Sequence, residues 1–138
     1  MGIQDRIEVA KRTKEGTNCG GTALFIVGMV PTDEEIDIVP TIDYHSNPNP
    51  PQLHYFGELE QLTGPQHGCL ILFRYQVMNN FPQHTGVVLA VEEGFQVVSR
   101  PQPGENIPLK FQSLDECLEH AKMMNELVEY YRPSSIYN

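Results

Sequence analysis

The chain has 138 residues, of which 40% are hydrophobic and 20% are charged, and it carries a formal net charge of −9 with a pI near 4.9. This length and composition predict a single globular domain over residues 1–138, and the acidic balance without a basic patch excludes nucleic acid and an anionic membrane surface as expected partners. Three cysteines without close pairing indicate free thiols in a reducing compartment.

The first residues lack a basic segment followed by an apolar core, so we expect no secretory signal. The most apolar run, residues 22–30, is too short to span a bilayer. We therefore expect a protein of the cytoplasm, or one exported without a signal peptide of the usual kind.

Two helices are predicted in the N-terminal part. Residues 3–14 carry apolar positions at helical spacing and predict a short amphipathic helix. A second helix is expected to begin at Cys19 and to end near Val30, because Pro31 follows. Two glycines directly after the cysteine are poor helix formers, which suggests that a substrate or another element approaches the backbone there.

A long surface loop and a short helix are predicted in the middle of the chain. Residues 32–52 contain an acidic segment that begins at Asp33, which we expect to be a solvated patch, and a proline-rich stretch. The apolar side chains of residues 53–62 are spaced so that they would share one face of a helix, so a short helix is expected there.

The second half of the chain predicts an antiparallel sheet. Residues 69–75, 84–91 and 94–99 are strand-like, and a tight turn at residues 92–94 pairs the last two strands as a hairpin. A loop with a short edge strand is expected to follow.

A closing helix is predicted after the sheet. Ser113 and Glu116, three residues apart, are typical of a helix start, and apolar residues at helical spacing continue to Tyr131. The order of elements indicates an α+β fold, with N-terminal helices packed on a central antiparallel β-sheet and a helix at the C-terminal end.

Cys19 is the candidate nucleophile. In the first turn of a helix, unpaired backbone N–H groups and the positive end of the helix dipole favour a thiolate. The thiol needs a base from elsewhere in the fold, and His84, at the start of a predicted strand, is the best candidate. Gln96 is a polar residue on the next strand and can hold the imidazole through its other nitrogen, although the sequence does not fix the hairpin register.

Together these residues resemble the NlpC-type peptidases, which belong to the papain-like cysteine hydrolases. In that family the cysteine usually stands in Asp-Cys-Ser-Gly, the histidine in His-(Val/Ile)-Gly, and a third polar residue about a dozen residues later. The matching segments here are Asn18-Cys19-Gly20-Gly21, His84-Thr85-Gly86 and, twelve residues after the histidine, Gln96. The resemblance implies a papain-like fold and a Cys19, His84 and Gln96 site that hydrolyses an amide bond, for example in a cell-wall peptide, through a thioester acyl enzyme.

Departures from the family pattern keep a second hypothesis open. Asn18, Gly20 and Thr85 replace the usual residues, Gln96 carries no charge, and no tyrosine directly precedes the cysteine to supply an oxyanion-hole hydroxyl. The alternatives are an NlpC-like binding or regulatory module with an idle site, and a deamidase or acyltransferase of the same superfamily. The expected partner is a peptide or another amide-containing substrate, and the sequence leaves a protein partner open.

No metal and no cofactor are expected. His45, His54, His67 and Cys69 follow no compact zinc-ligand spacing, and the chain contains neither a glycine-rich phosphate loop nor a dinucleotide fingerprint. Cys69 and Cys117 lie within apolar periodic segments, which predict core positions for both.

Overall fold

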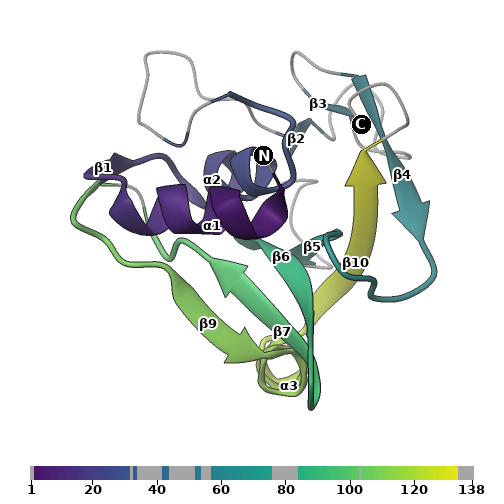
Figure 1. Cartoon of the computed structure of the whole chain (residues 1–138). Coiled ribbons are helices and arrows are strands. Elements are labelled where there is room, and N and C mark those ends of the chain that lie inside the picture. The colour runs from purple at the N-terminus through teal and green to yellow at the C-terminus, as the bar shows by residue number, and fades with distance from the viewer. Residues whose placement is uncertain are drawn as a thin grey trace.

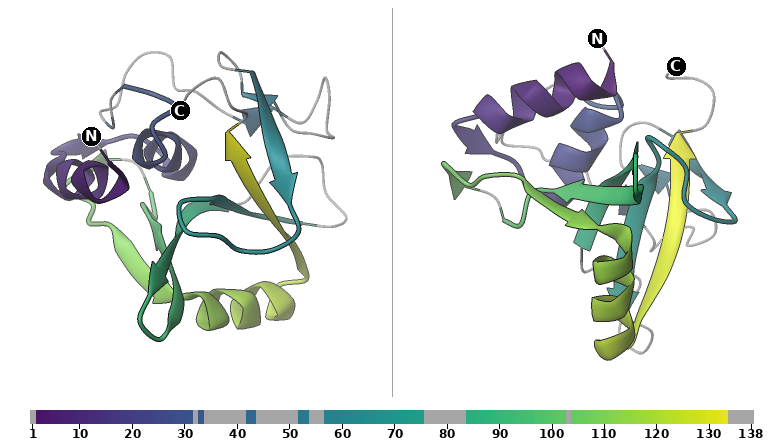
Figure 2. Two further views of the ribbon diagram at one scale, coloured as in Figure 1. Left: turned by 45° about the vertical axis from the view of Figure 1, so that its right-hand side comes forward. Right: turned by 60° about the horizontal axis from the view of Figure 1, so that its bottom comes forward.

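The computed structural model describes residues 2–31, 33, 42–43, 52–53, 57–75, 84–102 and 104–133. It is an α+β fold in which helices pack against an antiparallel sheet (Figure 1). The two N-terminal helices lie together on one side of the sheet and the third helix lies on the opposite side (Figure 2). Within the described part of the chain, no helix has the length and apolar character needed to cross a membrane.

Both N-terminal helices form where the sequence predicts them. Helix α1 spans Ile3–Arg12, and α2 spans Cys19–Ile26. The second helix ends earlier than expected because Gly28 adopts a left-handed conformation with φ of +88°. The amide of Met29 then donates to the carbonyl oxygen of Leu24 at 2.8 Å, which closes the helix in a Schellman-type turn.

The described strands of the main sheet lie in the order β2, β3, β4, β10, β5, β6, β7 and β9, and all neighbours are antiparallel. Their bounds are Ile42–Asp43 (β2), Gln52–Leu53 (β3), Gly57–Leu62 (β4), Leu70–Tyr75 (β5), His84–Val91 (β6), Gly94–Ser99 (β7), Lys110–Ser113 (β9) and Glu126–Pro133 (β10). A separate pair joins Glu15–Gly16 (β1) to Gly104–Glu105 (β8). The predicted strands β5, β6 and β7 and the β6–β7 hairpin are thus confirmed.

Two predicted helical segments are strands instead. The expected helix over residues 53–62 is wrong, because β4 pairs with β10 and this long-range pairing overrides the local helical spacing. The closing helix α3 spans only Leu114–Met123 and begins, as predicted, at Ser113. Asn125, with φ of +56°, then turns the chain into β10, which lies between β4 and β5.

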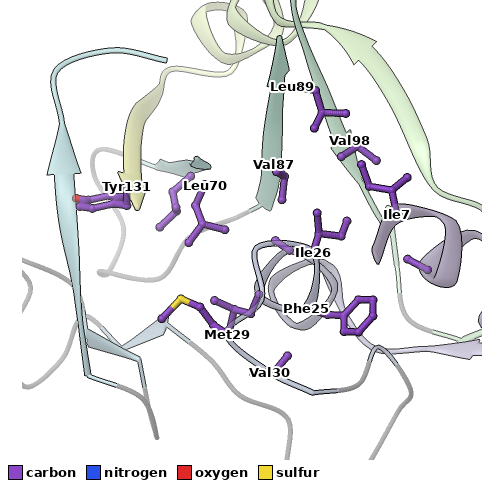
Figure 3. Close-up of a cluster of buried hydrophobic side chains, with 14 of the residues drawn as sticks. Ile7, Phe25, Ile26, Met29, Val30, Leu70, Val87, Leu89, Val98 and Tyr131 are labelled. Atoms are coloured by element: carbon purple, nitrogen blue, oxygen red, sulfur yellow. The ribbon is translucent and has the colours of Figure 1, made fainter. Parts of the chain in front are cut away.

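Two hydrophobic clusters cover the two faces of the sheet. On one face, Val87 of β6 packs with Ile26 of α2, as Figure 3 shows. On the other face, Val88 packs with Leu114 and Cys117 of α3. Alternate residues of a strand point to opposite faces, so odd-numbered residues of β6 face α2 and even-numbered ones face α3.

Candidate functional site

Cys19 lies at the open end of a buried helix. It is the first residue of α2 and is partly exposed, whereas residues 21–26 of the same helix are all buried. The Asn18 side chain caps the helix by accepting a hydrogen bond from the Gly21 amide at 2.7 Å. Among the described residues, no acceptor pairs with the amides of Cys19 and Gly20. N–H groups at the start of a helix are free to donate to an anion.

The two glycines of this first turn have different surroundings. A Cβ atom on Gly21 would lie 2.5 Å from Cγ2 and 2.6 Å from Oγ1 of Thr17, which is only 3% exposed. A Cβ atom on Gly20 would meet nothing closer than the Asn18 side chain at 3.5 Å. The close approach that the sequence suggests therefore exists at Gly21, and it comes from the chain itself.

Alanine substitutions at the two glycines of this turn are expected to change the free energy of unfolding by different amounts. Gly21→Ala should lower the free energy of unfolding by about 1–3 kcal/mol, because the added methyl group overlaps the buried Thr17 side chain. Gly20→Ala should leave it unchanged or raise it by up to about 1 kcal/mol, since alanine is the better helix former. Urea denaturation of both variants measures the difference, and an equal loss in both would contradict the assigned contact.

A buried ion pair between Asp33 and Arg100 is bonded to Thr22 of α2. Arg100 follows β7, is 0% exposed, and donates from Nη2 to Asp33 Oδ2 at 2.5 Å and from Nε to Thr22 Oγ1 at 2.9 Å. The Thr22 hydroxyl in turn donates to Asp33 Oδ1 at 2.5 Å. The predicted solvated patch is therefore wrong for Asp33, because its carboxylate is paired with an arginine far away in the sequence.

His84 is the first residue of β6, and its ring lies on the side of the sheet that faces α3. The imidazole stacks on Phe73, with ring centroids 6.2 Å apart. Both rings line a pocket of about 280 Å³ together with Lys110, Gln112 and Cys117. Because His84 is even-numbered in β6, it shares this face with Val88.

The fold brings the backbones of Cys19 and His84 to the same end of the sheet. Thr22, in the first turn of α2, is bound to Arg100, and the β6–β7 register continued to the strand ends sets position 100 across from Thr85. The His84 ring nevertheless lies on the α3 side of the sheet, whereas α2 packs on the other side, and no hydrogen bond joins Cys19 to His84 among the described residues. The predicted Cys19–His84 contact is not formed in this structure.

Gln96 lies away from both residues. It pairs with Leu89, which is five residues from His84 along β6. Arg100 follows Gln96 by four residues, or about 13 Å of strand. The predicted role of Gln96 in orienting His84 is therefore not supported. In this register, the residue at the end of β7 that lies across from the start of β6 is Arg100.

The pKa of His84 is lowered by burial and, to a smaller extent, by the positive charge of Lys110. The neutral imidazole is therefore favoured in the folded protein. Below its usual pKa of about 6.5, the unfolded chain binds more protons at this residue than the folded chain. Its contribution to stability is present above that pH and is lost as the pH falls through the folded pKa.

An NMR titration is expected to show this shift directly. His84 should titrate below its ordinary range, and Lys110→Gln should move its pKa upward because one of the two causes is removed. The conservative variant Lys110→Arg keeps the charge and should leave the value nearly unchanged. A His84 pKa at or above about 6.5 in the parent protein would contradict the buried position of the ring.

The other two cysteines occupy the predicted core positions. Cys69 and Cys117 are 2% and 8% exposed, and burial raises the pKa of each thiol. All three cysteines of the chain are free thiols. Among the described residues, no three His, Cys, Asp or Glu side chains lie close enough to hold a metal ion; His45 and His54 lie outside that part of the chain.

A larger pocket of about 450 Å³ is lined by Cys69 and by Val27, which follows α2. Two of its polar side chains form an ion pair, Arg132 Nε to Glu60 Oε2 at 2.9 Å. The Nδ1 atom of His67 accepts a hydrogen bond from the Ala90 amide at 2.9 Å. Because these groups are already partnered, this pocket offers less for catalysis than the start of α2.

No protein-family model, no curated protein and no solved structure matches this chain. The resemblance to NlpC-type peptidases consequently depends on the short motifs around Cys19 and His84.

Proposed function

We propose that this chain is a cysteine hydrolase of amide bonds, with Cys19 as the nucleophile and His84 as the base, on a papain-like fold of the NlpC type. One observation carries the proposal. A partly exposed thiol stands at the start of a buried helix, beside two amides without acceptors among the described residues, at the end of the sheet where the strand of His84 begins.

The proposed reaction is acyl transfer through a thioester. His84 accepts the proton of the Cys19 thiol, and the sulfur attacks the carbonyl carbon of the substrate. The amides of Cys19 and Gly20 donate to the oxyanion, so Gly20 supplies a donor in place of the missing tyrosine hydroxyl. The amine leaves with the proton from the imidazolium. Water then attacks the thioester, which releases a carboxylic acid and restores the thiol.

The proposal includes a movement of the His84 side chain. Its ring must leave the pocket on the α3 side to reach the sulfur of Cys19. His84 is the first residue of β6, so the proposed movement takes place at the end of the strand. Burial lowers the pKa of His84, which keeps the imidazole neutral, and this is the form that accepts a proton.

A hydrolysis assay tests the proposal. The protein is incubated with cell-wall disaccharide peptides and with unrelated peptides, and new amine and carboxyl ends are detected by mass spectrometry. Cys19→Ala should abolish cleavage, whereas Cys117→Ala, a matched change at the thiol of the α3-side pocket, should retain it. Cleavage that depends on Cys117 and not on Cys19 would overturn the assignment of the nucleophile.

The alternative is an NlpC-like binding or regulatory module with an idle site. The position of the His84 ring favours it, because the imidazole lies with Lys110 and Gln112 in a pocket on the far side of the sheet from Cys19. In this alternative no amide is cleaved, and the reactivity of Cys19 does not depend on His84.

A further inference from the structure

Arg100, which follows β7, lies on the α2 side of the sheet and binds Thr22 and Asp33. We propose that Arg100 is a positioning residue for Cys19, which holds the first turn of α2 at the end of the sheet where β6 begins. This inference rests on the proposed function in one respect, namely that Cys19 is the nucleophile.

The contacts of Arg100 reach four different segments of the chain. Its acceptors are the Thr22 hydroxyl of α2, the Asp33 carboxylate, the carbonyl oxygen of Ala10 in α1 and the carbonyl oxygen of Ile107. The distances from guanidinium nitrogen to acceptor run from 2.5 Å to 3.1 Å. A shift of α2 relative to β7 would break the Thr22–Arg100 bond and also the Thr22–Asp33 bond beside it, so the guanidinium and its carboxylate hold the two elements in place.

The segment that leads into α2 packs on the same ion pair. A Cβ atom on Gly16 would overlap the guanidinium of Arg100, so the backbone passes directly over it. The amide of Thr17 donates to the carbonyl oxygen of Asp33 at 2.9 Å. The chain on both sides of Cys19, at Thr17 and at Thr22, is thus tied to Asp33, whose carboxylate binds Arg100.

Thr22 allows this role to be tested without removing a charge. Thr22→Val keeps the shape of the side chain but removes the hydroxyl that links α2 to both Arg100 and Asp33. Thr22→Ser keeps the hydroxyl and is the conservative control. Each variant is made in the parent and in the His84→Ala background, and the rate of Cys19 alkylation by iodoacetamide is measured at pH 6.5, together with amide hydrogen exchange.

We expect two effects of Thr22→Val that Thr22→Ser does not produce. Exchange at the Gly21 amide should accelerate at least about tenfold, while exchange at Val88 in the sheet should change much less. The slowing of Cys19 alkylation by His84→Ala, present in the parent, should disappear, because Cys19 no longer holds its place beside the start of β6.

The results distinguish a failure of the positioning role of Arg100 from a failure of the proposed function. Unchanged exchange at Gly21 in Thr22→Val, or equal acceleration at Gly21 and Val88, overturns the positioning role of Arg100. If His84→Ala has no effect on Cys19 even in the parent, the proposed base is wrong. In that case a selective acceleration at Gly21 still supports the role of Arg100 in placing the helix start, and its absence overturns that role.

Discussion

Asp33→Asn is expected to lower the free energy of unfolding by about 3–5 kcal/mol, because it leaves the Arg100 guanidinium buried without its counter-charge. Both side chains of this ion pair are only 1% exposed, so water cannot replace the lost carboxylate. The Thr22 hydroxyl also loses a charged acceptor at 2.5 Å. Urea denaturation followed by circular dichroism measures the change.

Glu60→Gln is the matched control for this variant. It removes a carboxylate from an exposed pair with Arg132, in which two hydrogen bonds join side chains that are 53% and 50% exposed. Water screens that pair, so the denaturation midpoint should stay within experimental error of the parent value. Equal losses of unfolding free energy in Asp33→Asn and Glu60→Gln would show that burial does not determine how much the Asp33–Arg100 pair stabilises the fold.

The second large effect is expected at His84. Once an amide substrate cleaved by Cys19 is identified, His84→Ala should lower kcat/KM by about 10²–10⁴-fold, the range that removal of a general base produces. His120→Ala is the control, because His120 lines the same α3-side pocket but has no role in the proposed reaction. It should leave kcat/KM near the parent value.

Equal effects of the two histidine variants would contradict the role of His84 as base. They would indicate that both residues act only through the α3-side pocket. The pH dependence adds a further test, since the parent rate should fall as the pH drops through the lowered pKa of His84.

Local sequence patterns predict much of this fold. The apolar spacing in α1, the polar cap and buried run of α2, and the tight turn between β6 and β7 each depend on neighbouring residues, and each of these elements is present. The segment that forms β10 fits two patterns. Its apolar residues suit a helix, but Val128 and Tyr131 also suit opposite faces of a strand buried between β4 and β5.

The site is less predictable because it depends on the face of the sheet toward which each side chain of β6 points. Thr85 and Val87 are as buried as Val88, so the strand has no polar face that would place His84. The sequence also does not fix the hairpin register, and the observed pairing of Gln96 with Leu89 leaves Arg100, not Gln96, at the end of β7. The pairing of Arg100 with Asp33 spans 67 residues, and no local pattern reveals it.

The most direct test of the central claim is the pH dependence of iodoacetamide alkylation at each cysteine, read by mass spectrometry in the parent and in His84→Ala. We expect Cys19 to react rapidly below pH 7 and His84→Ala to slow it at least about tenfold, whereas Cys69 and Cys117 should react slowly because burial raises their pKa. Slow reaction of Cys19 until about pH 8.5, with no change in His84→Ala, would contradict the hydrolase proposal and favour the binding module.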